Sequence, residues 1–93
     1  MIKTFAGKRT KELYENGQSK RFPPGIWERA VCKLEYLDLA TSVTDLKAPP
    51  SNRLHKLDRD RAGQYLISVN DQWRECFRFE DGDAYDVEMT DYC

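Results

Sequence analysis

The spacing of apolar residues changes near residue 53, and this change constrains the fold more than any other feature. Between residues 24 and 40 apolar positions recur every three or four residues, the period of an amphipathic helix. This stripe consists of Ile26, Ala30, Leu34 and Leu37. After residue 53 apolar and polar residues alternate, as in strands with one covered face. We therefore expect helices first and a sheet second.

Turn and capping signals bound the helical half. Asn16-Gly17 is expected to end a short helix over 8–15, because glycine readily adopts the left-handed conformation after a helix. Pro23-Pro24 opens the longer helix, since proline at a first helical position loses no hydrogen bond. This helix is expected to run to about Ala40, and residues 41–46 to add a further turn.

The strand half is divided by hairpin signals. We expect strands over 53–57, 64–69, 73–79 and 83–91, a short first strand over 1–5, and a proline-containing connector over 47–52. Asn70-Asp71 and Asp81-Gly82 are typical of hairpin turns, so the last three strands should be antiparallel neighbours. The elements predict an α+β fold: a β-α-α segment, then a mostly antiparallel meander, with two helices packed on one face of a small sheet.

Length and composition predict one domain over 1–93 with a modest core. The first thirty residues contain no unbroken apolar run, so neither a secretory signal nor a membrane span is expected. Cys32, Cys76 and Cys93 are widely spaced, and the chain has a single His. This pattern argues against a disulfide framework and a zinc site, so we expect a cytoplasmic protein without a cofactor.

The net charge of −1 conceals an uneven distribution. Residues 1–79 hold all fifteen Lys and Arg residues and ten of the sixteen acids, a net charge of +5. Residues 80–93 hold six acids and no base, a net charge of −6. The basic part either faces a polyanion or is an ordinary solvated surface of mixed charge, and composition alone favours the second interpretation. The acidic strand either faces a protein partner or is a charged edge that discourages association.

The strand over 73–79 divides its side chains between two faces. The face expected beneath the helices carries Trp73, Phe77 and Phe79. Glu75 also points there, which requires it to lie near an edge. Arg74 and Arg78 point to the uncovered face together with Cys76. There they are either solvating charges or phosphate anchors, because guanidinium offers a forked set of donors suited to phosphate.

A basic segment and the chain end supply the other candidate groups. Residues 53–61 hold three Arg, one Lys and the only His against two Asp. A basic cluster of this kind is more often an ordinary loop than a nucleic-acid contact, and the candidate contacts to nucleic acid are Arg53, Lys56, Arg59, Arg61 and Arg78. The strand over 83–91 is expected to turn Ala84 and Asp86 to one side and Tyr85, Val87 and Met89 to the other. We expect His55, Arg74 and Asp91-Tyr92-Cys93 to meet on the open face.

Family-typical residues occur in order along almost the whole chain. They are Lys3, Phe5, 53–57 (RLHKL), 61–63 (RAG), 69–74 (VNDQWR), Phe77, 82–85 (GDAY) and 91–92 (DY). With them the sequence resembles the HigB-type toxins of the RelE/ParE superfamily, from bacterial type II toxin–antitoxin systems. The most specific part is the start of the strand at residues 70–74 combined with Asp91-Tyr92.

The resemblance implies an endoribonuclease that cuts mRNA in the A site of the 70S ribosome and so blocks translation. It implies attack by the ribose 2′-OH without a metal, and neutralisation by a HigA-type helix-turn-helix antitoxin. Operator DNA would be contacted only through the antitoxin, and no membrane is involved. The family's catalytic positions fall on His55, Arg74, Asp91, Tyr92 and Cys93.

The roles follow from the needs of the reaction. Arg74, with Arg59 or Arg61, would stabilise the phosphorane charge. His55 or Asp91 would accept the 2′-OH proton. Tyr92 would stack on a base or hydrogen-bond to the phosphate, and Cys93 would donate a proton.

Two positions depart from the family pattern and keep another interpretation open. Cys93 stands where the family usually has His, and Asp58 where members often have Lys, so weakened catalysis is expected. The alternatives are a gyrase-directed relative of the ParE branch, an impaired toxin retained as an antitoxin-binding partner, or, if the resemblance fails, a small binding domain. Arg74 with Asp91-Tyr92 favours the nuclease over a gyrase inhibitor.

Overall fold

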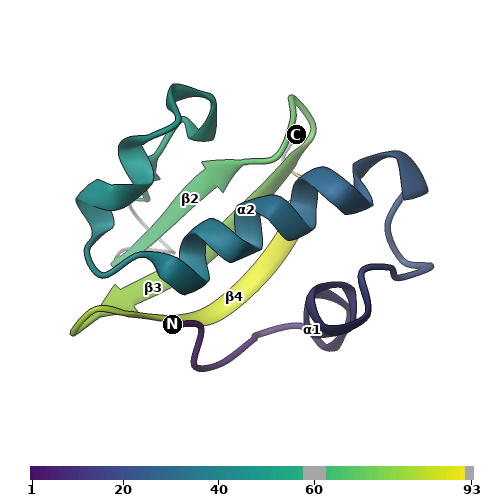
Figure 1. The fold of residues 1–93 in the computed structure, drawn as a ribbon, viewed down its shortest axis with the longest axis horizontal. Coiled ribbons are helices and arrows are strands. Elements are labelled where there is room, and N and C mark those ends of the chain that lie inside the picture. The colour runs from purple at the N-terminus through teal and green to yellow at the C-terminus, as the bar shows by residue number, and fades with distance from the viewer. Residues whose placement is uncertain (58–62, 92–93) are drawn as a thin grey trace.

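A computed structural model describes residues 1–57 and 63–91 and packs helices against one face of a sheet (Figure 1). The helices are α1 (Lys8–Asn16) and α2 (Trp27–Leu39), with 3-10 turns η1 (Pro24–Ile26), η2 (Val43–Lys47) and η3 (Pro50–Asn52). The strands are β1 (His55–Lys56), β2 (Gln64–Ser68), β3 (Trp73–Glu80) and β4 (Asp83–Asp91). Within the described ranges the sheet order is β1-β2-β3-β4, with antiparallel neighbours. The predicted α+β fold is confirmed.

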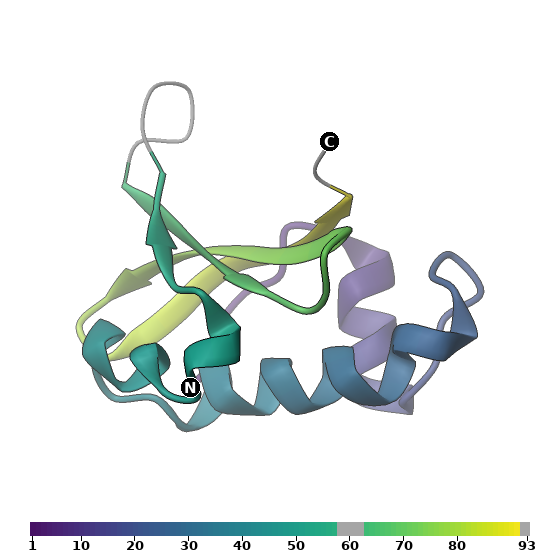
Figure 2. The same cartoon turned by 90° about the horizontal axis from the view of Figure 1, so that it is seen from above.

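The helices begin and end close to the expected residues. α1 ends at Gly17, whose φ of 78° lies in the left-handed region and whose N–H donates to Leu13 O. α2 follows the 3-10 turn η1 and extends across the sheet, which lies on one side of it (Figure 2). Leu34 and Leu37 are fully buried against Phe77 of β3. Burial of one such side chain stabilises the fold by about 1.5–3 kcal/mol.

The first residues pair with β4 without forming a strand of their own. Ile2 and Phe5 form isolated parallel bridges with Ala84 and Val87. The N–H of Lys3 donates to Ala84 O at 2.8 Å. The expected strand over 1–5 is thus reduced to two bridges, and this segment covers part of the edge of β4. Negative side chains on β4 are therefore not needed to protect a fully open edge.

The expected alternation along β4 is wrong for Ala84 and for Tyr85, which lies opposite Arg78 on the open face. The register shifts between Cys76 and Arg78 because β4 holds one extra residue there, and Asp86 has a φ of 53°. Such a bulge reverses the parity of the residues that follow it. Ala84 and Val87 consequently both face the helices and are both fully buried.

Glu75 is not near an edge, as its place in the pattern had required. It lies on the inner strand β3, is fully buried, and its carboxylate oxygens have no hydrogen-bond partner among the described residues. Burial raises the pKa of Glu75 well above its ordinary value, and the charge of Lys33 opposes this shift more weakly. The neutral, protonated form is thereby favoured.

A buried polar cluster fixes the connector that leads into β1. The Lys33 ammonium donates to Asn52 Oδ1 at 2.5 Å and to Ser51 Oγ at 3.2 Å. The Asn52 amide donates to Leu46 O at 3.1 Å and to Ala48 O at 3.3 Å. α2 thus holds η3 in place two residues before β1 begins. Arg53 follows in the left-handed conformation, so the expected strand over 53–57 shortens to His55–Lys56.

None of the described helices is long and apolar enough to cross a membrane.

Candidate active site

The sheet register assigns each candidate side chain to a face. Directly opposed residues on neighbouring strands point to the same side of a sheet. One row on the face away from α2 joins Ser68, Arg74 and Thr90. The next row joins His55, Leu66, Cys76 and Glu88. Arg74 and His55 therefore share the face that the helices leave uncovered (Figure 2).

Arg74 is held by the backbone of the β2–β3 turn. Its Nη1 donates to the carbonyl oxygens of Asn70 and, at 3.3 Å, Trp73. Asn70 also organises the turn, because its Oδ1 accepts the N–H groups of Gln72 at 2.8 Å and Trp73 at 2.7 Å. The Ser68 hydroxyl donates to Asn70 O at 2.9 Å. Asn70 is thus a positioning residue for the guanidinium of Arg74.

The other residues of the turn connect it to the end of β4 and to the core. Gln72 Nε2 donates to Asp91 Oδ2 at 3.0 Å. The Trp73 ring packs edge-on against Phe22, with ring centroids 5.4 Å apart. Residues 70–74 therefore form the turn, position Arg74 and hold the end of β4. These contacts are the physical role of the run of residues singled out in the sequence.

His55 lies on the outer strand β1 and is exposed. Its ladder partner is Leu66 on β2. On the open face the row of His55 is next to the row of Arg74, and His55 itself is two strands away from Arg74. Strand spacing and rise put the two Cα atoms about 12 Å apart. Long side chains can span this distance from both sides of one nucleotide, so an imidazole and a guanidinium flank the same stretch of open face.

The side chain of Asp91 projects from the opposite face of the sheet, the face that the helices cover. Its ladder partner is Trp73, which packs on the helix side, whereas Arg74 pairs with Thr90. The expectation that Asp91 lies beside Arg74 on the open face is therefore not met by the register. Its exposed carboxylate is at the end of β4, where Gln72 holds it.

Arg78 shares the open face, but carboxylates neutralise it. Its Nε donates to Asp86 Oδ2 at 2.9 Å and its Nη1 to Glu80 Oε1 at 2.7 Å. The guanidinium also lies 5.1 Å from the centre of the Tyr85 ring. The pKa of Arg78 is raised above its ordinary value, chiefly by the hydrogen bond to Asp86. The described contacts give Arg78 a structural role.

Comparison with known proteins decides the family. The model of the HigB-like toxins, described as RelE-like toxins of type II toxin–antitoxin systems, matches residues 3–92. The chain is 37% identical over 92 residues to "Endoribonuclease HigB" of Proteus vulgaris, covering 99% of each chain. It is 38% identical over 90 residues to "Toxin HigB-1" of Vibrio cholerae, covering 96% of this chain and 95% of that one. The chain belongs to the HigB family of RelE-like toxins.

The described part of this HigB-like toxin contains some of the predicted RNA contacts. Arg53 is exposed and its Nη1 lies 4.0 Å from Asp71 Oδ1, a weak surface pair. Lys56 is exposed and shares the side of its partner Tyr65 rather than that of His55. The other expected residues lie outside the described ones: Arg59, Arg61, Tyr92 and Cys93, together with Asp58.

Sequence reasoning missed several residues of the open face in this HigB-like toxin. Ser68 and Thr90 flank Arg74 on either side, and Glu88 lies in the row of His55. Only parity applied to neighbouring strands in a known register finds these three residues. Parity along its own strand had already assigned Cys76 to this face, and its thiol is buried there, 3.6 Å from Thr90 Oγ1. In residues 1–57 and 63–91 no group of three or more His, Cys, Asp or Glu side chains is arranged to hold a metal ion.

Proposed function

We propose that this HigB-like toxin is an endoribonuclease that cleaves mRNA through groups on the open face of its sheet. The observation that carries the proposal is the shared face of Arg74 and His55 in a chain of this family. Arg74 is anchored through Nη1 to backbone carbonyls, which orients the rest of its guanidinium before substrate arrives. A donor fixed in advance stabilises transition-state charge without reorganisation.

In the proposed reaction His55 takes the proton of a ribose 2′-OH as that oxygen attacks the adjacent phosphorus. The P–O2′ bond forms, the P–O5′ bond breaks, and the leaving 5′-oxygen takes a proton from an acid near the chain end. We assign that acid to Cys93, with Tyr92 stacking on a base or bonding the phosphate. Arg74 stabilises the charge on the phosphorane. The products are a 2′,3′-cyclic phosphate and a free 5′-OH.

We assign the role of general base to His55 rather than Asp91. The side chain of Asp91 projects from the helix side of the sheet and accepts a hydrogen bond from Gln72. In this proposal Asp91 fixes the end of β4. Arg53 supplies positive charge two residues before His55, and Arg59 and Arg61 are in the segment that follows. Lys56 projects from the other face of β1 and adds only to the general positive field. The name "Endoribonuclease HigB" of the Proteus vulgaris relative supports the proposed endoribonuclease activity.

The wider setting of the proposal is a toxin–antitoxin module. The target is mRNA in the ribosome of the cytoplasm, and a HigA-type antitoxin neutralises the toxin. The family description as toxins of type II systems supports such a partner.

The test is expression under tight control with mapping of message 5′ ends. Codon-phased cuts bearing 5′-OH ends, abolished by Arg74→Ala, are the expected result. Growth arrest with intact messages and altered DNA supercoiling would instead favour a gyrase-directed toxin. Intact messages with a stable antitoxin complex and no arrest would favour an impaired toxin that only binds its antitoxin.

A further inference from the structure

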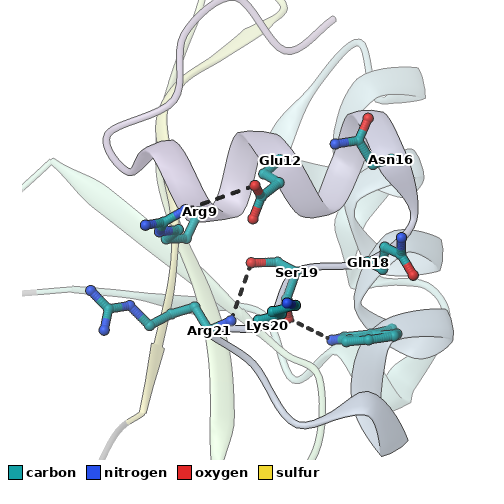
Figure 3. A pocket seen from close by; sticks show the side chains of 8 residues that line it. Arg9, Glu12, Asn16, Gln18, Ser19, Lys20 and Arg21 are labelled. Carbon is teal, nitrogen blue, oxygen red and sulfur yellow. Dashed lines mark hydrogen bonds and ion pairs between the residues drawn. The ribbon is translucent and has the colours of Figure 1, made fainter.

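A hollow lies between α1 and the loop that follows it (Figure 3). Its volume is about 740 Å³. The lining residues are Arg9, Glu12, Asn16, Gln18, Ser19, Lys20, Arg21 and Trp27. We call it the α1 groove. Cations, amides and one hydroxyl make up most of its lining, and Trp27 is its one aromatic residue.

The loop wall of the α1 groove is locked in shape by hydrogen bonds. Trp27 Nε1 donates to the carbonyl oxygens of Ser19 at 3.0 Å and Phe22 at 2.9 Å. The N–H of Arg21 donates to Ser19 Oγ at 3.4 Å, and Ser19 is 4% exposed. A ligand therefore meets a preformed wall, which reduces the entropy cost of binding.

The charge in the α1 groove favours an anion. Three cations line it against one carboxylate, Glu12, which lies 3.8 Å from Arg9. Among the described residues no ion pair engages Lys20 or Arg21. Both side chains are exposed, so they keep their charge available for phosphate oxygens.

The α1 groove adjoins the end of the sheet that carries Arg74. Arg21 directly precedes Phe22, whose ring packs on Trp73 next to Arg74. Asp91, the ladder partner of Trp73, marks the same end of β4. An RNA strand that crosses the open face and passes this end of the sheet would next meet the wall bearing Arg21.

We propose that the α1 groove binds the sugar–phosphate backbone of RNA and is a second RNA-contacting surface of this toxin. Its three cations contact phosphates, and the amides of Asn16 and Gln18 bond to sugar or phosphate oxygens. These contacts carry no sequence information and position the protein on its substrate. Protein-docking surfaces are enriched in aromatic residues and depleted in Lys and Glu, whereas Trp27 is the groove's one aromatic residue and Lys20 and Glu12 line it. The inference rests on the proposed function, since it extends the RNA path beyond the open face.

The test compares two triple variants of equal charge. Arg9→Gln, Lys20→Gln and Arg21→Gln together remove the cations of the α1 groove. The probe is a fluorescent 20-nucleotide RNA with every 2′-OH methylated, which cannot be cut by 2′-OH attack. Anisotropy titrations at several KCl concentrations give affinity and its salt dependence. We expect the groove variant to bind at least tenfold more weakly, with a salt slope smaller by about 2, at about 0.7 per single-strand phosphate contact.

The matched control removes three exposed lysines outside both surfaces: Lys3→Gln, Lys11→Gln and Lys47→Gln. It should bind within about twofold to threefold of wild type, because only the diffuse field changes. Melting temperatures of both variants check that the fold is retained. Equal losses in the two variants would overturn the proposal, since the effect would then be one of net charge.

A second arm identifies the source of the RNA by sedimentation with purified small ribosomal subunits. A groove-specific loss on subunits alone assigns the α1 groove to ribosomal RNA. A groove-specific loss on free RNA assigns it to the message strand. If the groove variant binds both the methylated RNA and the small subunit as wild type does, the proposal is overturned. This holds whether or not the variant binds the antitoxin more weakly. If wild type binds RNA through the groove yet cuts no message, the nuclease proposal fails and this one stands.

Discussion

Gln72 Nε2 donates a hydrogen bond of 3.0 Å to Asp91 Oδ2, and this bond joins the β2–β3 turn to the end of β4. The same turn anchors Arg74 through the carbonyl oxygen of Asn70. The arginine and the end of β4 are therefore fixed by one short segment. Changes in the turn should alter catalysis more than stability.

The first prediction concerns that bond. Gln72→Ala should lower the rate of message cleavage about tenfold, because about 1.4 kcal/mol of positioning corresponds to one factor of ten. The free energy of unfolding should change by less than about 0.5 kcal/mol, since both side chains are exposed. Cleavage assays and urea titrations measure the two effects. Asp71→Ala, in the same turn and 99% exposed, is the matched control. Equal activity of both variants would contradict a positioning role for Gln72.

Arg74 should carry the largest effect of any described residue. Arg74→Ala should reduce cleavage by about 10² to 10³, the usual loss when one charge-stabilising donor is removed. Arg74→Lys should recover only part of the rate, because the three donors of an ammonium lie on one atom, whereas the planar guanidinium can bond the carbonyls through Nη1 and a phosphate through its other nitrogens. Single-turnover cleavage of ribosome-bound message measures both variants. Full activity of Arg74→Ala would end the assignment.

Local patterns predicted most of the helices and the meander. The apolar stripe of α2 and the turn at Gly17 depend on residues close in sequence, so periodicity and capping chemistry identify them. The bulge at Asp86 broke the alternation, because a positive φ at one aspartate leaves no periodic signal. The burial of Glu75 was also missed: parity gives the face of a side chain but not its depth.

The candidate site was predictable only in part. Parity put Arg74 on the open face, and the register confirms this. The role of Asn70 was not predictable, since it works through a backbone carbonyl that has no signature in the sequence. Asp91 was expected beside Arg74, but the side from which a strand's last residue projects depends on the register with its neighbour.

The polar cluster under β1 yields a stability prediction. Asn52 is fully buried and makes three hydrogen bonds, so Asn52→Ala leaves Lys33 and two carbonyls with fewer partners. We expect the free energy of unfolding to fall by at least about 1–3 kcal/mol, the usual cost of one buried polar group left unsatisfied. Urea denaturation measures it. Asn16→Ala, at an exposed position, should change stability by less than about 0.5 kcal/mol. A similar small change for Asn52→Ala would refute the structural role.

Glu75 makes stability depend on pH. Its pKa is raised in the folded protein, chiefly by burial. Below the pKa of Glu75 in the unfolded chain, about 4.3, both the folded and the unfolded state hold the proton, and the free energy of unfolding is not reduced. As pH rises above that value the unfolded chain loses its proton first, so the free energy of unfolding falls until the folded pKa is reached. Glu75→Gln should therefore be more stable than wild type at pH 7.5, and this advantage should shrink towards pH 4.

Urea titrations at the two pH values test this dependence. Glu15→Gln, at an exposed position of α1, is the control and should track wild type at both. A difference between Glu75→Gln and wild type that is the same at pH 4 and pH 7.5 would show that the charge of Glu75 is not responsible.

The last prediction concerns Cys93, at the position where the family resemblance implies a histidine. An ordinary thiol has a pKa of about 8.5 and an ordinary imidazole one of about 6.5, so imidazole is better matched to proton transfer near pH 7. Cys93→His should raise cleavage of ribosome-bound message about tenfold at pH 7. Cys93→Ser, which keeps the size and removes the thiol, should lower it. If Cys93→Ser cleaves at the wild-type rate, the thiol takes no part in proton transfer and the acid must be sought elsewhere.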